Sequence, residues 1–218
     1  MRKSIVAILC FIITLNAHAG LVINVDFHDG NGKPTDDYAA AGVAGFWNVL
    51  GSGLGNGAEI LDGVGQVTGI SISCNLSLFG VTTSNQGTEG NDGALLSDYL
   101  VNGAAEFDLT ISGLEDGQYD ILVYALGRQD YPCGTTVTIN GNVNNQKYLT
   151  GIWPGSLMEG RTHTNHRVIV NSDPITLSVY SASDAFIDGL QIVQVPEPAT
   201  LLLLGLGAVM LRRKATAD

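Results

Sequence analysis

Oxygen-bearing side chains gather in a segment of twelve residues near the start of the chain. In order, they are Asp26, Asp29, Asn31, Asp36 and Asp37. Hard cations take several oxygen ligands from a flexible loop, so this spacing makes the segment a candidate for a structural calcium site. The segment does not match an EF-hand, because Lys33 stands where that motif places its third ligand. The alternative is a solvated acidic loop, and no other cofactor is predicted.

Aromatic residues in predicted loops form a second set of candidates. The faces of tryptophan and tyrosine rings stack on the apolar faces of sugars. Trp47, Tyr131 and Trp153 lie in or near such loops, and Arg128 can add a polar contact. These four residues predict a glycan-contact site. The alternative is that Trp47 fills the core and Trp153 caps the edge of a sheet.

The sequence contains no signature of a nucleophile or of a phosphate-binding loop. It has no Gly-x-Ser-x-Gly turn, and the Gly-Lys at 32–33 is followed by proline instead of a helix start. Paired carboxylates for glycoside hydrolysis have no sequence signature, because the partners meet only in space. We therefore expect a protein that is not an enzyme. A secreted glycan-processing enzyme with such a pair remains the alternative.

Regular alternation of apolar and polar residues dominates positions 20–194. It is clearest at 21–27, 70–76 and 107–111, and clusters of Gly, Asn and Asp separate such runs. About eight to ten short strands follow from this pattern, which predicts an all-β fold, an antiparallel β-sandwich or jelly roll. Asn140-Gly141 predicts a tight turn. Helical signal is confined to 38–47 and 95–101.

The body of the chain is strongly acidic. The whole chain has a formal net charge of −11, and residues 20–195 carry 5 basic and 19 acidic residues. Such a surface repels nucleic acid and anionic lipid. We therefore expect no nucleic-acid partner.

The first nineteen residues have the organisation of a signal peptide. Arg2 and Lys3 precede an apolar stretch, and Ala17-His18-Ala19 fits the small-x-small cleavage pattern. Cleavage after Ala19 makes Gly20 the first mature residue. The alternative is an anchor that is never cut, although the stretch is short for a membrane span.

Export permits the two cysteines of the body, Cys74 and Cys133, to oxidise. A disulfide closing this long loop would stabilise the fold by roughly 4 kcal/mol. Cys74 occupies an apolar phase of its strand, so two buried free thiols are the alternative.

The C-terminal residues 195–218 have an unusual composition. Pro196-Glu197-Pro198 precedes the thirteen apolar residues 199–211, and Arg212, Arg213 and Lys214 follow. A comfortable helical span needs roughly 20 residues, and basic residues remain on the cytoplasmic side. The pattern predicts an exported body held by a short transmembrane helix, either as a permanent anchor or as a removable signal.

The order Pro-Glu-Pro, apolar helix and basic cluster resembles the PEP-CTERM sorting signal of Gram-negative bacteria. The resemblance implies that a membrane-embedded exosortase recognises the tail and cuts near Pro-Glu-Pro. It also implies an intermediate in the inner membrane and a destination at the cell surface or in the extracellular matrix, in bacteria that make exopolysaccharide.

The body is similar, more weakly, to galactose-binding-like jelly rolls of secreted bacterial proteins. The residues concerned are 23–27, 111–121 and 186–192. The resemblance implies that the first and last strands pair, joining 22–27 to 189–193. Together, these features predict three parts: a signal peptide (1–19), a β-sandwich (20–194) and a sorting signal (195–218). The expected function is structural or adhesive, with exopolysaccharide as a partner.

Overall fold

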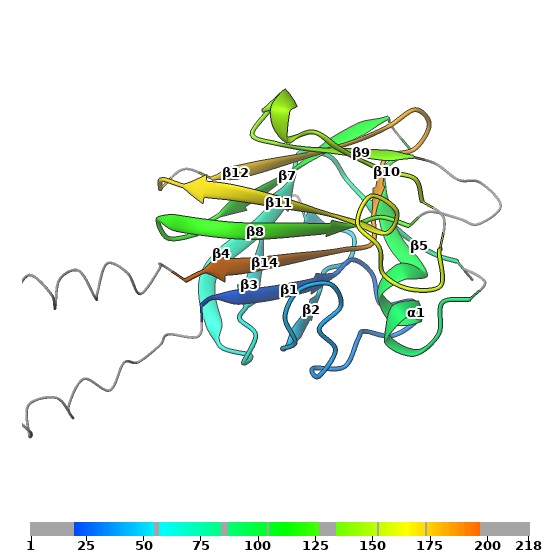
Figure 1. The fold of residues 1–218 in the computed structure, drawn as a ribbon, viewed down its shortest axis with the longest axis horizontal. Helices are drawn as coiled ribbons and strands as arrows, with labels where there is room; N and C mark the ends of the chain where they lie inside the picture. Colours follow the sequence, from blue (N-terminus) through cyan, green and yellow to red (C-terminus); the bar gives the residue numbers. More distant parts are fainter. Residues whose placement is uncertain are drawn as a thin grey trace, which may run out of the picture.

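Two β-sheets and a smaller third sheet form the body of the protein (Figure 1). The computed structural model describes residues 20–54, 57–83, 87–103, 105–126, 134–151, 153–172 and 174–196. The predicted signal peptide and nearly all of the sorting tail lie outside these residues. Within them, no helix is long and apolar enough to cross a membrane.

The five-stranded sheet contains the first and last strands of the body. In spatial order its strands are β11 (His163–Val170), β8 (Gly117–Tyr124), β14 (Gly189–Val195), β1 (Val22–Asp26) and β2 (Trp47–Val49). β1 and β14 pair antiparallel, with Val22 opposite Val193. The pairing implied by the second resemblance is therefore confirmed. β8, which is nearly continuously apolar from Tyr119 onward, lies between β11 and β14.

The prediction of purely antiparallel pairing is wrong at one place. β2 pairs parallel to β1, with Asn24 opposite Trp47. Parallel neighbours need a long crossover connection, and the segment 27–46 between these two strands provides one.

The six-stranded sheet faces the five-stranded sheet. In spatial order its strands are β10 (Lys147–Leu149), β9 (Thr135–Ile139), β12 (Ile175–Ser181), β7 (Glu106–Ser112), β4 (Val67–Cys74) and β3 (Ala58–Leu61). The third sheet contains β13 (Phe186–Ile187), β6 (Asp98–Val101) and β5 (Phe79–Thr82). A short 3-10 helix spans Val143–Asn145. At the predicted Asn140-Gly141 turn both residues have positive φ, 51° and 62°, as a type I′ turn requires.

The main core lies between the two large sheets. Ile23, Ile121 and Ile192 contribute to it from the five-stranded sheet, and Ile72 and Leu109 from the six-stranded sheet. All five side chains are fully buried. The sandwich expected from the alternation pattern is therefore present.

A second apolar cluster covers the other face of the five-stranded sheet. It contains Trp47, Leu95, Leu96, Leu122, Tyr124 and Leu126. Leu95 and Leu96 belong to α1 (Gly90–Leu96), so this helix begins before the predicted 95–101 segment. The residues after it form β6 instead, because they pair with β5 and β13. The helix predicted at 38–47 is absent, and that segment consists of turns leading into β2.

Removing the indole of Trp47 should cost much of the stability of the domain. Trp47 is fully buried in the second cluster, and truncating a buried tryptophan leaves a large cavity. We expect Trp47→Ala to lower the free energy of unfolding by about 3–5 kcal/mol. Val64→Ala, at a side chain that is 77% exposed, should stay within about 0.5 kcal/mol. Urea denaturation measures both variants, and equal losses would contradict the assignment.

Candidate functional site

The structure separates the four predicted glycan-contact residues. Trp47 is fully buried, stacks on Tyr38 with ring centroids 6.1 Å apart, and donates its indole N–H to the Tyr38 carbonyl at 3.2 Å. Its predicted glycan contact is therefore wrong, because the second apolar cluster encloses the ring. Trp153 is half-buried and packs against that cluster. Tyr131 and Arg128 lie outside the described residues.

The five residues of the predicted calcium loop have different surroundings. Asp26 is fully buried, whereas Asp29, Asp36 and Asp37 are exposed. Asn31 turns toward β6, with its backbone N–H bonded to Asp98 Oδ2 at 2.9 Å. Within the described residues, no three His, Cys, Asp or Glu side chains are arranged to hold a metal ion. Calcium binding by this loop stays a prediction.

The side chain of Cys74 lies in the main core, on the buried face of β4. Burial raises the pKa of this thiol, which makes it less reactive. Cys133 lies outside the described residues, so the proposed disulfide stays a prediction.

Three aspartates meet in a buried cluster that the sequence did not predict. Asp26 ends β1, Asp98 begins β6, and Asp188 lies between β13 and β14; none of the three is exposed to solvent. Asp188 Oδ2 accepts the N–H of Leu126 at 2.5 Å. Both oxygens of Asp26, and Oδ1 of Asp98 and of Asp188, have no hydrogen-bond partner among the described residues.

Burial and mutual repulsion shift the titration of this cluster. Burial first, and then repulsion by Asp98 and Asp188, raises the pKa of Asp26 to about 10. Burial raises the pKa of Asp98 to about 6 and that of Asp188 well above its usual range. Asp26 is therefore protonated at neutral pH. This removes a charge that burial would otherwise penalise.

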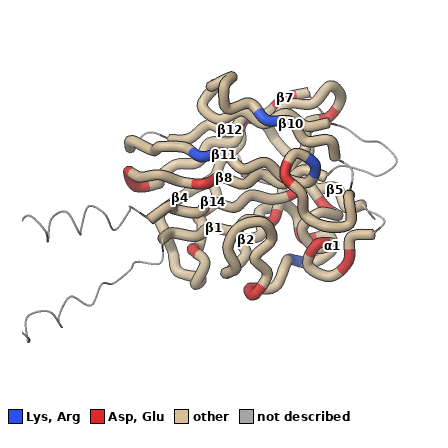
Figure 2. Tube along the Cα trace, viewed as in Figure 1, with Lys and Arg blue, Asp and Glu red and all other residues tan. Residues whose placement is uncertain are grey.

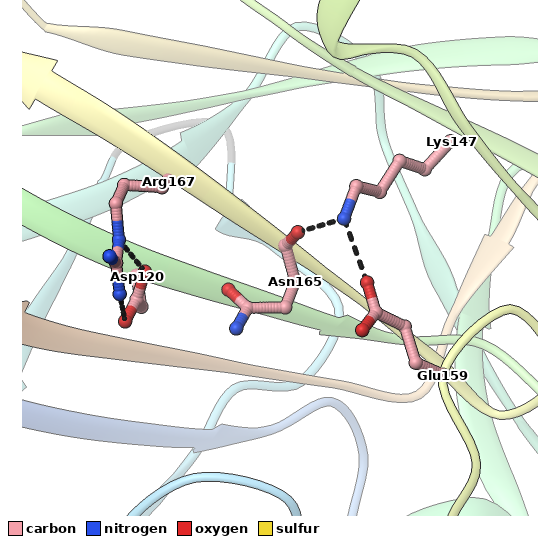
Figure 3. A pocket seen from close by; sticks show the side chains of 5 residues that line it. All are labelled: Asp120, Lys147, Glu159, Asn165 and Arg167. Carbon is pink, nitrogen blue, oxygen red and sulfur yellow. Dashed lines mark hydrogen bonds and ion pairs between the residues drawn. The ribbon is translucent and has the colours of Figure 1, made fainter.

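A charged pocket of about 260 Å³ lies where β10 of one sheet meets β11 of the other. It is lined by Asp120, Lys147, Glu159, Asn165 and Arg167 (Figure 3). Arg167 binds Asp120 through two hydrogen bonds of 2.8 Å. Lys147 donates to Glu159 Oε1 at 2.7 Å and also to the backbone carbonyl of Asn165. Lys147 thus ties the edges of the two sheets together.

The acids of this pocket are unsuited to donate a proton to a glycosidic oxygen. The hydrogen bond from Lys147 lowers the pKa of Glu159, whereas a general acid for glycoside hydrolysis needs a raised pKa. Asp120 is engaged by Arg167 on both of its oxygens. The pocket can hold polar groups, but its charges already neutralise each other.

The outer face of the six-stranded sheet is a broad polar surface. Along β7, β9, β12 and the part of β4 from Ile70 onward, the aliphatic residues and Phe107 point into the core, and the residues between them are partly or well exposed. Most of these outward residues carry hydroxyl groups; they are Ser71, Ser73, Thr110, Ser112, Thr136, Thr138, Thr176 and Ser178. We call this surface the hydroxyl face.

Two exposed tyrosines stand on the hydroxyl face. Tyr148 on β10 is 57% exposed and Tyr180 on β12 is 47% exposed. Both are opposite Thr136 of β9, one on each side. Neither tyrosine was among the predicted glycan-contact residues, because those were all taken from predicted loops. The signal was present for Tyr180, which follows the outward positions Thr176 and Ser178 in the alternation of β12.

Basic residues are scarce on the described body, as the composition indicated. Figure 2 shows Lys and Arg at a few separate points of the trace, with Asp and Glu more widely spread. Two of the basic residues are the pocket residues Lys147 and Arg167, each paired with an acid. No continuous basic surface is available for a polyanion within the described residues.

The C-terminal residues match a known protein-sorting motif. Residues 194–214 match the model of the PEP-CTERM protein-sorting motif. The C-terminal segment is a PEP-CTERM sorting motif. Proteins with this motif are exported and sorted to the cell surface, and the motif implies processing by an exosortase. Of the matched residues, the structure describes 194–196.

No curated protein matches the chain. Among solved structures, the ANXUR2 extracellular domain from Arabidopsis thaliana is similar over 81% of this chain and 42% of that chain, with 10% identity and a TM-score of 0.49. A beta-glucuronidase from Bacteroides uniformis is similar over 58% of this chain and 14% of that chain, at 16% identity and a TM-score of 0.42. A family 35 carbohydrate binding module from Clostridium thermocellum is similar over 57% of this chain and 92% of that chain, at 18% identity and a TM-score of 0.34.

The buried aspartates should make the protein less stable at alkaline pH. Their pKa values are raised above the unfolded value near 4, so the stability they contribute is complete below that pH. It is lost as pH rises through about 6 for Asp98 and toward about 10 for Asp26. Asp29 adds to the repulsion on Asp26, and Lys33 opposes it.

Asp26→Asn keeps the shape of this side chain without a charge. At pH 9 its free energy of unfolding should exceed that of the wild type by at least about 1.4 kcal/mol, the equivalent of one pKa unit. Urea denaturation between pH 5 and 9.5 measures the difference. Glu106→Gln removes an exposed carboxylate. Its free energy of unfolding should change with pH as steeply as that of the wild type. If the free energy of unfolding of Asp26→Asn depended on pH as steeply as that of the wild type, the raised pKa assigned to Asp26 would be contradicted.

Proposed function

We propose that the protein is a structural or adhesive component of the cell surface or extracellular matrix, delivered by its PEP-CTERM motif and contacting exopolysaccharide. The observation that carries this proposal is the motif match at 194–214. We interpret the two facing sheets as a jelly roll of the galactose-binding-like kind, and we propose that this body acts after sorting, outside the cell.

The position of the motif in the fold supports a removable tail. The last strand, β14, ends at Val195, and Pro196 follows it directly. Gln194 is still tied to the first residues of the body by hydrogen bonds in both directions with Leu21. A cut near Pro-Glu-Pro would therefore leave every strand of the sandwich in place.

The electrostatics of the acids support a protein that is not an enzyme. The carboxylates in the pocket are paired with Arg167 and Lys147. The acids with raised pKa values are fully buried, where a polymer cannot reach them. A glycan-processing enzyme would need an accessible acid with a raised pKa.

Mass and location of the mature protein test the sorting proposal. In the producing bacterium, we expect the wild-type protein in the surface or matrix fraction, beginning at Gly20 and ending near residues 196–198. Replacing Pro196, Glu197 and Pro198 by alanine should leave a chain that extends to Asp218 and fractionates with the inner membrane. Recovery of wild-type protein with the complete tail from the matrix would overturn removal of the tail.

Reducing-end assays test the enzymatic alternative. We expect no release of reducing ends above the buffer control when the exported protein is incubated with matrix polysaccharide, because the pocket acids are held in ion pairs. Asp120→Asn and Glu159→Gln serve as matched variants of the pocket. Release by the wild type that is lost in either variant would establish a glycan-processing enzyme.

A further inference from the structure

We propose that the hydroxyl face binds a chain of neutral polysaccharide, with Tyr148 and Tyr180 as its two stacking platforms. This inference rests on the proposed function and names the surface and the class of glycan. Both tyrosines are in register with Thr136 of β9, so they lie in one row across three strands. Neighbouring strands are about 4.8 Å apart, which separates the tyrosines by roughly 10 Å. That is about the span of two sugar rings.

The Tyr148 ring lies over the backbone of Gly134. A Cβ atom at Gly134 would overlap this ring, so the tyrosine occupies the space that a side chain at position 134 would need. Gly134 has no positive φ, and its lack of a side chain is explained by this packing. A side chain at position 134 would therefore displace the Tyr148 ring.

The surroundings of the two rings suit a polyhydroxylated ligand. Thr136 stands between the tyrosines, and Thr138 and Ser178 form the next row of the sheet. Asp108 continues that row and accepts the Ser178 hydroxyl at 2.6 Å. Hydroxyl side chains both donate and accept hydrogen bonds, as sugar hydroxyls do.

The charge of the hydroxyl face selects the class of glycan. The outward positions of its described strands include the acids Glu106 and Asp108 but no Lys or Arg. Glu106 stands directly opposite Tyr180. A uronic-acid or phosphate-bearing polymer would meet like charge without a cation to bind it. A neutral polymer meets no such repulsion.

The tyrosine row lies far from the point where the chain leaves the sandwich. The last residue of β14, Val195, is opposite Gln118 at the start of β8, and β8 follows β7 through the short connection after Ser112. Glu106, beside Tyr180, is at the other end of β7. Six residue steps at about 3.4 Å place the row roughly 20 Å along the sandwich from that end. In a protein still attached to the membrane by its tail, the row of Tyr148, Thr136 and Tyr180 would therefore lie at the end of the sandwich that is farther from the attachment point.

Binding to fractionated matrix polysaccharide tests the assignment. The probes are the neutral and acidic fractions of the producing bacterium's matrix polysaccharide, separated by ion exchange and cast into native gels. The exported protein should be retarded by the neutral fraction only. Tyr148→Ala and Tyr180→Ala should each weaken the apparent affinity about tenfold, because each removes one stacking surface. Gly134→Ala should weaken it similarly by displacing the Tyr148 ring.

Two controls separate binding from folding. Phe79→Ala removes an aromatic side chain that is 51% exposed on β5, a strand of the third sheet, and should bind like the wild type. Tyr148→Phe keeps the ring and should restore most of the affinity. The urea midpoints of the tyrosine variants should match that of the wild type.

The possible failures are distinguishable. Retardation by the neutral fraction that is unchanged in the double Tyr148→Ala, Tyr180→Ala variant would overturn the surface but leave glycan contact standing. Retardation by the acidic fraction only would overturn the class of glycan. No retardation by either fraction would overturn this inference together with the glycan part of the proposed function, whereas sorting is decided separately by the mass of the mature chain.

Discussion

Burial of the five-stranded sheet on both of its faces is the constraint on which the rest of the structure depends. One face packs against the six-stranded sheet, and α1, Trp47 and Leu126 cover part of the other. Two covered faces leave little room for polar side chains. The six-stranded sheet, by contrast, has one covered face, and its other face remains available to solvent. The division into an enclosed sheet and an open sheet explains where contact with a partner can occur.

Polar residues of the enclosed sheet are accommodated in two different ways. Gln191 joins a neutral network, in which it accepts the Tyr124 hydroxyl at 2.5 Å and donates to Asn24 Oδ1 at 2.8 Å. Asp26, at the end of the same strand as Asn24, has no such partners. Its burial is compatible with the fold because the carboxyl group holds a proton. The same covering layer therefore produces one satisfied network and one cluster whose charge depends on pH.

The same division decides what the sequence could predict. Alternation identified β4 and β7 correctly because each has one buried and one solvated face. It did not predict the burial of Asp26, which occupies a polar phase of β1 yet is fully buried. Trp47 was ambiguous for the same reason, since no local pattern shows that α1 folds over β2. The sorting motif was predictable because it depends on local composition and order alone. The hydroxyl face depends on register between strands, which the sequence does not state.

A surface protein needs one region for attachment to the membrane and another that stays accessible to a partner. In this fold the two regions lie at different ends of the sandwich. The first and last strands pair side by side, so both ends of the body leave the sandwich at one end (Figure 1). The row formed by Tyr148, Thr136 and Tyr180 lies on the six-stranded sheet, which does not contain β1 or β14. It lies beside Glu106, the first residue of β7. Removal of the tail therefore changes what the protein is attached to without disturbing the strands that carry the hydroxyl face. If the tail is cut as we propose, the same face would be available to a polymer both before and after the cut.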